Sequence, residues 1–496
     1  MKNTKINTVI IALAVCMLVT GCGNASLDST ASKGSTASAS AVTYTDSSSA
    51  EESSSETKAE TSKTTTTTTK ASSKAESSSE TEESVAATAK SSTSGVSVED
   101  KSSAAEPVTS GTVAKSESAA SVVSAVEGSK LDVSDMFTNR DLELTADTND
   151  AESITAASGK TVEITEAGVY VISGTASNFT VKVNAGDDDK VQLVLDSLNV
   201  TNDSTPAIYV VNADKVFVTT ASDSSLSTTG SFTADGDTNT DAVIYSKDDI
   251  VLNGTAALTI TSTANGITGK DDLKVTGGTY SITSALDAIE ANDSIRISGG
   301  SFTINSSKDG LHAENSDDNT LGYIYISGGS FNITAASDGI QGTTVAQIDG
   351  GTFNISASEG IESTYVQING GSITISASDD GVNAANKSSS ETVAFEMTGG
   401  ELTITMASGD TDAVDSNGSV KVSGGTINIT CPTQGTAESF DYDGTATYTG
   451  GTIIINGEQV DSIPTPMMMG GGMGGGMRGG NMGGQMGGNM GGFGRR

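Results

Sequence analysis

A double glycine that recurs through the second half of the chain constrains the fold more than any other feature. Its copies are Gly277-Gly278, Gly299-Gly300, Gly328-Gly329, Gly350-Gly351, Gly370-Gly371, Gly399-Gly400, Gly424-Gly425 and Gly450-Gly451. Subtracting neighbouring positions gives steps of 22, 29, 22, 20, 29, 25 and 26 residues. Such a period is typical of repeat proteins in which each unit stacks on its neighbours.

Apolar residues alternate on both sides of each glycine pair. Two and four residues after the pair, two columns begin with Tyr280, Phe302, Phe331 and with Ile282, Ile304, Ile333; a column before it begins with Val275, Ile297, Ile326. A further column reads Ile289, Leu311, Ile340, Ile361, Val382 and Val414. A period of two places these side chains on one face of a strand. Three short strands per repeat, each stacked on its own copy, predict an all-β parallel β-helix.

The N-terminal part of the chain reads as an exported, tethered segment. Residues 1–21 combine Lys2 and Lys5 with an apolar run and end in small residues before Cys22, which predicts a lipoprotein signal peptide and lipidation of Cys22. The alternatives are a plain secretory signal or a short membrane helix. The prediction places the protein on the outer face of a bacterial cell membrane.

Composition sets the remaining boundaries. Residues 22–130 are rich in Ser, Thr, Ala, Glu and Lys with almost no large apolar residue, which predicts a disordered linker. Apolar patterning from 131 to 463 assigns that range to the β-helix, and residues 464–496 form a Gly- and Met-rich tail expected to be flexible. Cys431 falls in a column of small inward residues and is expected to be a core thiol.

The charge of the chain is strongly one-sided. It carries 26 basic and 62 acidic residues, a formal net charge of -36. Such a surface repels a phosphate backbone, so nucleic-acid binding is not expected, whereas divalent cations are concentrated around it.

Acidic residues also recur in register. The turn before the third strand of each repeat carries Asp287, Asp309, Asp338, Glu359, Asp380 and Asp412, and three residues later stand Glu290, His312, Gln341, Glu362, Asn383 and Asp415. Oxygen-rich columns of this kind suit Ca²⁺. With the acidic insertion after His312, the candidate calcium ligands are Asp287, Glu290, Asp309, Glu314, Asp317, Asp318, Asp338 and Glu359. The alternative is that Asp serves these turns by hydrogen-bonding the backbone.

A column that points away from the core beside the first strand is the candidate sugar-binding surface. It reads Lys274, Arg296, Tyr325, Gln347, Gln367, Glu396 and Lys421, flanked by Tyr323 and Tyr365. Arg can hold a carboxylate and Tyr can lie against a sugar ring. The candidate carbohydrate-binding residues are therefore Arg296, Tyr323, Tyr325 and Tyr365, together with His312; the alternative is an ordinary polar, exposed sheet.

Between residues 169 and 456 the sequence resembles the calcium-binding carbohydrate-binding domain family of clostridial-type surface proteins. The stretches that carry the resemblance are GDDDKV at 186–191, PAIYV at 206–210, IYSKDD at 244–249, GKDDL at 269–273, KDGLHAEN at 308–315 and LGYIYI at 321–326. The resemblance implies a right-handed parallel β-helix similar to that of pectate lyases. It also implies binding of cellulose-like and acidic, polygalacturonate-like polysaccharides, with bound Ca²⁺ and no established cleavage.

Three functions remain open from the sequence. The first is non-catalytic binding of plant cell-wall polysaccharide. The second is a calcium-assisted polysaccharide lyase, in which Lys308 or Lys270 would be the base; aspartates beside both lysines favour the charged form, which opposes that role. The third is a structural surface adhesin with no sugar specificity.

Overall fold

A computed structural model describes residues 128–466 except 410, 434 and 435. All of them belong to the second of two compact units, Ser110–Arg496. The predicted signal peptide, Cys22, nearly all of the predicted linker and the end of the tail lie outside these residues. Within the described range there is no helix, and so none that could cross a membrane.

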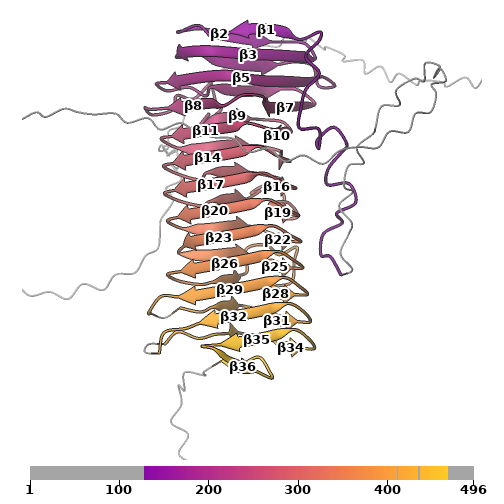
Figure 1. Cartoon of the computed structure of the whole chain (residues 1–496), viewed down its shortest axis with the longest axis vertical. Helices are drawn as coiled ribbons and strands as arrows, with labels where there is room; N and C mark the ends of the chain where they lie inside the picture. Colours follow the sequence, from indigo (N-terminus) through magenta and orange to yellow (C-terminus); the bar gives the residue numbers. More distant parts are fainter. Residues whose placement is uncertain (1–127, 410, 434–435, 467–496) are drawn as a thin grey trace, which may run out of the picture. The chain divides into compact units, whose positions relative to one another are not determined.

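The strands stack into a coil with three faces (Figure 1). The first face, before each double glycine, consists of β7 (Lys215–Thr220), β10 (Ile250–Gly254), β13 (Asp272–Val275), β16 (Ser294–Ile297), β19 (Tyr323–Ile326), β22 (Val345–Ile348), β25 (Tyr365–Ile368), β28 (Ala394–Met397), β31 (Ser419–Val422) and β34 (Ala446–Tyr448). The second face, after each double glycine, consists of β8 (Ser224–Thr228), β11 (Ala257–Ser262), β14 (Thr279–Ser284), β17 (Ser301–Ser306), β20 (Ser330–Ala335), β23 (Thr352–Ala357), β26 (Ser372–Ala377), β29 (Glu401–Met406), β32 (Thr426–Thr430) and β35 (Thr452–Ile455).

The third face is a separate sheet. It consists of β2 (Thr161–Ile164), β4 (Thr180–Asn184), β6 (Ile208–Asn212), β9 (Ala242–Ser246), β12 (Asn265–Gly269), β15 (Ile289–Ala291), β18 (Leu311–Ala313), β21 (Asp338–Gly342), β24 (Glu359–Ser363), β27 (Val382–Ala384), β30 (Val414–Ser416) and β33 (Asp441–Tyr442). At the start of the coil, β1 (Glu152–Thr155), β3 (Gly168–Ser177) and β5 (Lys190–Asn202) join the first two faces, because β5 pairs with both β7 and β8. At its end, β36 (Glu458–Val460) turns back antiparallel to β35.

The register confirms the all-β parallel β-helix and its columns. Each strand of a face pairs in parallel with the strand one rung on, and Tyr280, Phe302, Phe331 and Phe353 are Cα partners in succession. The columns that begin with Ile282, Val275 and Ile289 stack in the same way and are buried. Ahead of the double glycines, the apolar runs at 169–172, 191–195, 208–211 and 216–218 lie within β3, β5, β6 and β7.

The two glycines of each pair are needed for different reasons. At Gly350 an added Cβ would lie 2.6 Å from the carbonyl oxygen of Ser327 in the preceding rung. Gly351 has a φ of +107°, a conformation that strains a residue with a side chain. The repeat therefore marks the corner between the first two faces, where the backbones of successive rungs come close together.

Aromatic rings form a stack inside the coil. Neighbouring ring centroids lie 5.2 Å apart for Tyr280 and Phe302, 4.7 Å for Phe302 and Phe331, and 4.5 Å for Phe331 and Phe353. All four side chains are buried. Cys431 is buried in the same core, as predicted.

Residues 128–144, which we call the strap, precede the coil and lie against its first face. Val133 and Met136 pack with Tyr325, and buried Asp141 pairs with Lys274 at 3.3 Å. Residues 128–130, which the sequence assigns to the linker, are already hydrogen-bonded to Gln347 and Gln367. The chain then enters the coil at β1, so residues 131–151 of the predicted β-helix range lie outside its rungs.

Replacing Phe331 by Ala should remove a ring that is stacked on both sides and leave a cavity. We expect a loss of about 3 to 5 kcal/mol in the free energy of unfolding, measured by urea denaturation. The matched control is Ser330→Ala on the same strand, whose exposed side chain should change stability by less than about 0.5 kcal/mol. Equal effects of the two substitutions would contradict the stacked core.

Candidate functional site

The acidic column before the third face is held by hydrogen bonds between rungs. A side-chain oxygen of one rung accepts the backbone N–H of the equivalent residue in the next. The acceptor and donor residues are Asn265 and Asp287 (3.0 Å), Asp287 and Asp309 (2.9 Å), Asp309 and Asp338 (3.0 Å), and Asp380 and Asp412 (2.9 Å). The aspartates therefore do hydrogen-bond the backbone of these turns, but each one binds the turn of the next rung and not its own.

Cationic side chains neutralise the first part of this column. The oxygens of Asp287 and Asp309 and a ring nitrogen of His312 lie within 4.8 Å of one another. The Lys308 Nζ lies 2.9 Å from Asp287 Oδ2 and 3.6 Å from Asp309 Oδ2. His312 Nδ1 lies 3.3 Å from Asp287 Oδ2, and its Nε2 lies 3.5 Å from Glu314 Oε2. An ammonium group thus stands beside these carboxylates, where a metal ion would otherwise have to supply the positive charge.

The pKa values of this first cluster reflect the pairing. Burial is the largest single influence on Asp287 and His312, and it opposes their charged forms. The hydrogen bonds from His312 and Lys308, with the charge of His312 and the backbone N–H of Asp309, together outweigh it and hold the pKa of Asp287 at about 2. The hydrogen bonds to Asp287 and Glu314 raise the pKa of His312 to about 9. Asp287 and His312 therefore form a charged, mutually compensated pair near neutral pH.

A second cluster, Asp338, Glu359 and Glu362, has little such compensation. Its carboxylate oxygens also lie within 4.8 Å of one another. The amide of Gln341 donates to both Asp338 Oδ2 and Glu362 Oε2, each at 2.7 Å. Lys387 pairs with Glu362 at 2.5 Å, and within the described part of the chain no ion pair involves Asp338 or Glu359.

Burial and mutual repulsion perturb this second cluster strongly. Burial, followed by the charges of neighbouring acids, raises the pKa of Asp338 to about 7 and that of Glu359 to about 8. Asn383 donates to Glu359 Oε2 at 3.1 Å, while its own Oδ1 is buried and has no hydrogen-bond partner among the described residues. The three carboxylates make a hard, oxygen-only donor set, which fits Ca²⁺.

The remaining predicted calcium ligands are not gathered into either cluster. Glu290 accepts hydrogen bonds from Asn265, Thr268 and Lys270. Glu314 meets the first cluster only through His312. Asp317 and Asp318 are exposed in the loop before β19, where Asp318 caps the backbone of Thr320, and neither belongs to a group of three metal-ligating side chains in the described part of the chain.

The predicted sugar-binding column points away from the core as expected but is covered by the strap. Lys274, Tyr325, Gln347 and Gln367 are all buried, and Tyr325 is 0% exposed. Its hydroxyl hydrogen-bonds Asp349, and its ring lies 6.4 Å from that of Phe137 in the strap. The expectation of an open polar sheet is wrong here, because residues far away in sequence lie over it.

The other candidates on the first face are engaged in similar contacts. Arg296 pairs with Asp272 at 2.7 Å and lies 5.3 Å from the centre of the Tyr323 ring. The Tyr323 hydroxyl reaches Met136 Sδ at 3.9 Å. Tyr365 is 7% exposed and hydrogen-bonds Glu396. His312 lies in the first acidic cluster on the third face, apart from these tyrosines.

The lysines considered for lyase chemistry are both paired with carboxylates. Burial alone would lower the pKa of Lys308, but the hydrogen bond and charge of Asp287 raise it instead. Lys270 pairs with Glu290 at 3.4 Å. A base must be neutral to accept a proton, and the raised pKa of Lys308 favours its charged form.

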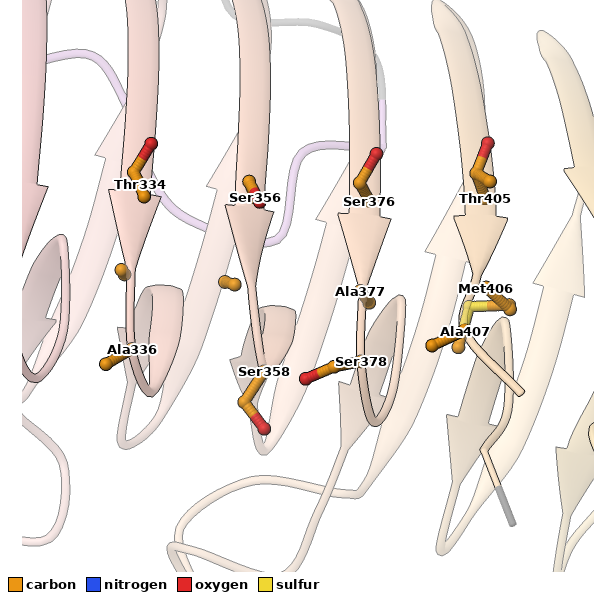
Figure 2. Close-up of a pocket in the computed structure, with 12 residues that line it drawn as sticks. Thr334, Ala336, Ser356, Ser358, Ser376, Ala377, Ser378, Thr405, Met406 and Ala407 are labelled. Carbon is orange, nitrogen blue, oxygen red and sulfur yellow. The ribbon is translucent and has the colours of Figure 1, made fainter. Parts of the chain in front are cut away.

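An open groove runs along the edge of the second face (Figure 2). Its volume is about 440 Å³, and its small side chains come from successive rungs, with Thr334, Ser356, Ser376 and Thr405 in a row at the ends of β20, β23, β26 and β29. It contains no charged or titratable residue. The groove therefore offers hydroxyl, backbone and methyl contacts, with the thioether of Met406 at one end.

Four residues of these sites are not among the calcium ligands or sugar-binding residues predicted from the sequence. Glu362 and Asn383 stand in a predicted column, and a search for the rung with fewest neighbouring cations could have found them. Gln347 and Gln367 were assigned to the outward column, but no periodic signal reveals their partner, the strap.

Comparison with known proteins identifies the class. Residues 158–411 and 358–465 match the family described as carbohydrate-binding domain-containing protein, and the chain belongs to this family. A protein of Acetivibrio thermocellus (strain ATCC 27405) with the same description is 36% identical over 128 residues, which are 25% of this chain and 45% of that protein. The chain thus spans less than half the length of this relative. The predicted membership of a carbohydrate-binding domain family is confirmed.

One solved structure is also similar. It is described as the polysaccharide lyase-like protein from C. thermocellum, gadolinium derivative. The sequence identity is 29% and the TM-score 0.40, and the match covers 45% of this chain and 96% of that chain.

The His312 pairing predicts a pH dependence of stability. Because the pKa of His312 is raised from 6.5 to about 9, its contribution is complete below about pH 6.5 and is lost as the pH rises through 9. We expect wild-type protein to lose on the order of 2 kcal/mol more than His312→Gln between pH 6.5 and 9.5, measured by urea denaturation at each pH. The raised acids of the second cluster also destabilise the fold over this range, but they are common to both proteins. Parallel pH profiles would contradict the pairing.

Proposed function

We propose that this protein is a non-catalytic, lipid-anchored surface protein that binds plant cell-wall polysaccharide, both cellulose-like and polygalacturonate-like, with bound Ca²⁺. Membership of a carbohydrate-binding family supports the ligand class. The observation that carries the calcium part is the second acidic cluster, in which three carboxylates converge with a single lysine beside them. Anchoring through Cys22 at the outer face of a bacterial membrane rests on the N-terminal sequence.

Asp338, Glu359 and Glu362 would hold the calcium ion. When bound, the ion supplies positive charge that an acidic coil lacks and that uronate carboxylates can share. The strands set the spacing of these side chains. Asp338 lies in β21 and both Glu359 and Glu362 lie in β24, and these strands pair in a fixed register with each other and with β27. This arrangement reconciles a chain of net charge -36 with an acidic ligand.

Binding without cleavage agrees best with the contacts of Lys308 and Lys270. Each lysine is paired with a carboxylate, and the pKa of Lys308 is raised. Lys387, the lysine beside the cluster proposed to hold calcium, is likewise paired with Glu362.

Calcium should raise the thermal stability of the protein through the second cluster. At a Ca²⁺ concentration about 100-fold above the dissociation constant, the gain is about 2.7 kcal/mol, measurable by differential scanning calorimetry. Glu359→Gln combined with Glu362→Gln should abolish the gain. The control is Asp379→Asn, which removes an exposed charge near the same column and should leave the gain intact. Calcium affinity should fall below about pH 8, because Asp338 and Glu359 must release protons to bind the ion.

Binding to polysaccharide tests the function directly. We expect full-length protein to be retained on polygalacturonate in the presence of Ca²⁺ and to be released by a chelator, with the double Gln variant not retained in either condition. Binding to cellulose should persist in chelator. Failure to bind any plant polysaccharide with or without Ca²⁺ would overturn the proposal, and release of unsaturated uronides would establish a lyase in its place.

A further inference from the structure

The strap has two parts that differ in how firmly they are held. Its second part contains the buried side chains of Val133, Met136 and Asp141, and Asp141 lies between Lys274 and Lys215. Its first part, residues 128–132, which we call the lip, has no buried side chain: Gly128 and Asp132 are exposed and the three residues between them are half-buried. Leu131 packs against the small apolar cluster of Val345, Tyr365 and Ala394, which is separate from the main core of the coil. The lip can therefore leave the surface while that main core stays closed.

Two glutamine side chains grip the lip. Gln367 accepts the Lys130 backbone N–H at 2.8 Å and donates to the Gly128 carbonyl oxygen at 2.9 Å. One rung back, Gln347 accepts the Leu131 N–H at 2.8 Å and donates to Ser129 Oγ at 2.5 Å. Three of these four bonds go to backbone atoms, so they depend little on which side chains the lip carries. Any extended chain with alternating donors and acceptors, including the hydroxyls of a sugar polymer, can satisfy the same amides.

The lip also covers an aromatic ring. Lys130 Nζ lies 4.7 Å from the centre of the Tyr365 ring, and the same Nζ pairs with Glu391 at 2.5 Å. Lys421 Nζ lies 5.7 Å from that centre. With the lip removed, a tyrosine face would be left beside two amides, the elements that bind a sugar ring and its hydroxyls.

Charge around this ring selects among glycans. Glu396 hydrogen-bonds the Tyr365 hydroxyl and Glu391 lies at the lip. Once Lys130 has left, the two carboxylates remain near the ring together with the ammonium group of Lys421. A uronate would be repelled there, whereas a neutral glycan would not.

We propose that the lip is a displaceable cover, and that a neutral glycan chain takes its place along Gln347, Gln367 and Tyr365 while the rest of the strap stays bound. The inference rests on the proposed polysaccharide-binding function and adds its regulation. The lip is held by hydrogen bonds to two buried glutamines, by a partly exposed ion pair and by the half-buried side chain of Leu131. Each of these contacts is weak on its own. Ordering five residues opposes them, so the closed lip lies near balance.

The first test opens the lip by one substitution in the full-length protein. Lys130→Glu reverses the charge beside Glu391 and Tyr365, and cellohexaose should bind about 10-fold more tightly than to wild type, measured by calorimetry. The matched control is Lys190→Glu, which changes net charge equally at an exposed pair with Asp214 and should bind like wild type. Replacing residues 128–132 by alternating Gly and Ser should reproduce the gain, and Tyr365→Ala should cancel it. An unchanged affinity in both opened variants overturns the inference.

The second test observes the lip without relying on affinity. Trypsin cleaves after Lys130 only when the lip leaves the surface, so cellohexaose should accelerate this cleavage several-fold in wild-type protein while cleavage after Lys190 stays constant. Slower or unchanged cleavage at Lys130 by a glycan that does bind overturns the lip and leaves the proposed function standing. Absence of glycan binding by wild type and by both opened variants overturns the proposed function as well.

Discussion

The parallel hydrogen-bond ladder between rungs sets the terms for every other interaction in this protein. It holds each residue about one strand spacing, roughly 4.8 Å, from its counterpart in the next rung. Apolar columns gain from this repetition, as the ring stack from Tyr280 to Phe353 shows. Acidic columns suffer from it, because like charges are brought together at the same spacing. The third face shows how the chain compensates: by bonds to the next backbone, by Lys308 and His312, and by raised pKa values further along.

Periodic features of the fold could be predicted from the sequence, and features without a period could not. The inward columns, the register and the position of the acidic ladder follow from the double glycine, since stacking repeats the same side chain in each rung. The strap does not repeat, and its contacts join residues as far apart as Lys130 and Gln367. Hence the repeat predicts the correct face for Tyr323, Tyr325 and Tyr365, but it does not predict that the strap covers them. For the acidic residues, the column could be predicted from the repeat. The rung whose carboxylates lack a neighbouring cation could not, because it depends on which carboxylates Lys308 and Lys387 contact.

The three faces offer different chemistry to a ligand. The third carries buried carboxylates suited to a hard cation, the first carries amides and tyrosines beneath the strap, and the second carries exposed Ser, Thr and Asn with a shallow groove at its edge. A single scaffold can therefore present a charged and a neutral recognition surface without either perturbing the other, because the core lies between them. This separation is consistent with a carbohydrate-binding protein whose ligands differ in charge.

The strap also alters how the coil holds together. In a solenoid each rung touches only its neighbours, so stability propagates along one dimension and unravelling can start at either end and stop anywhere. The strap instead contacts β25 through Gln367 and reaches back to β7, where Arg140 lies over Phe217 and Lys215 faces Asp141. Rungs several steps apart thereby share a common partner. We therefore expect the rungs from β7 to β25 to unfold together as one cooperative unit. At the two ends of the coil, the stability of each rung depends only on its neighbours.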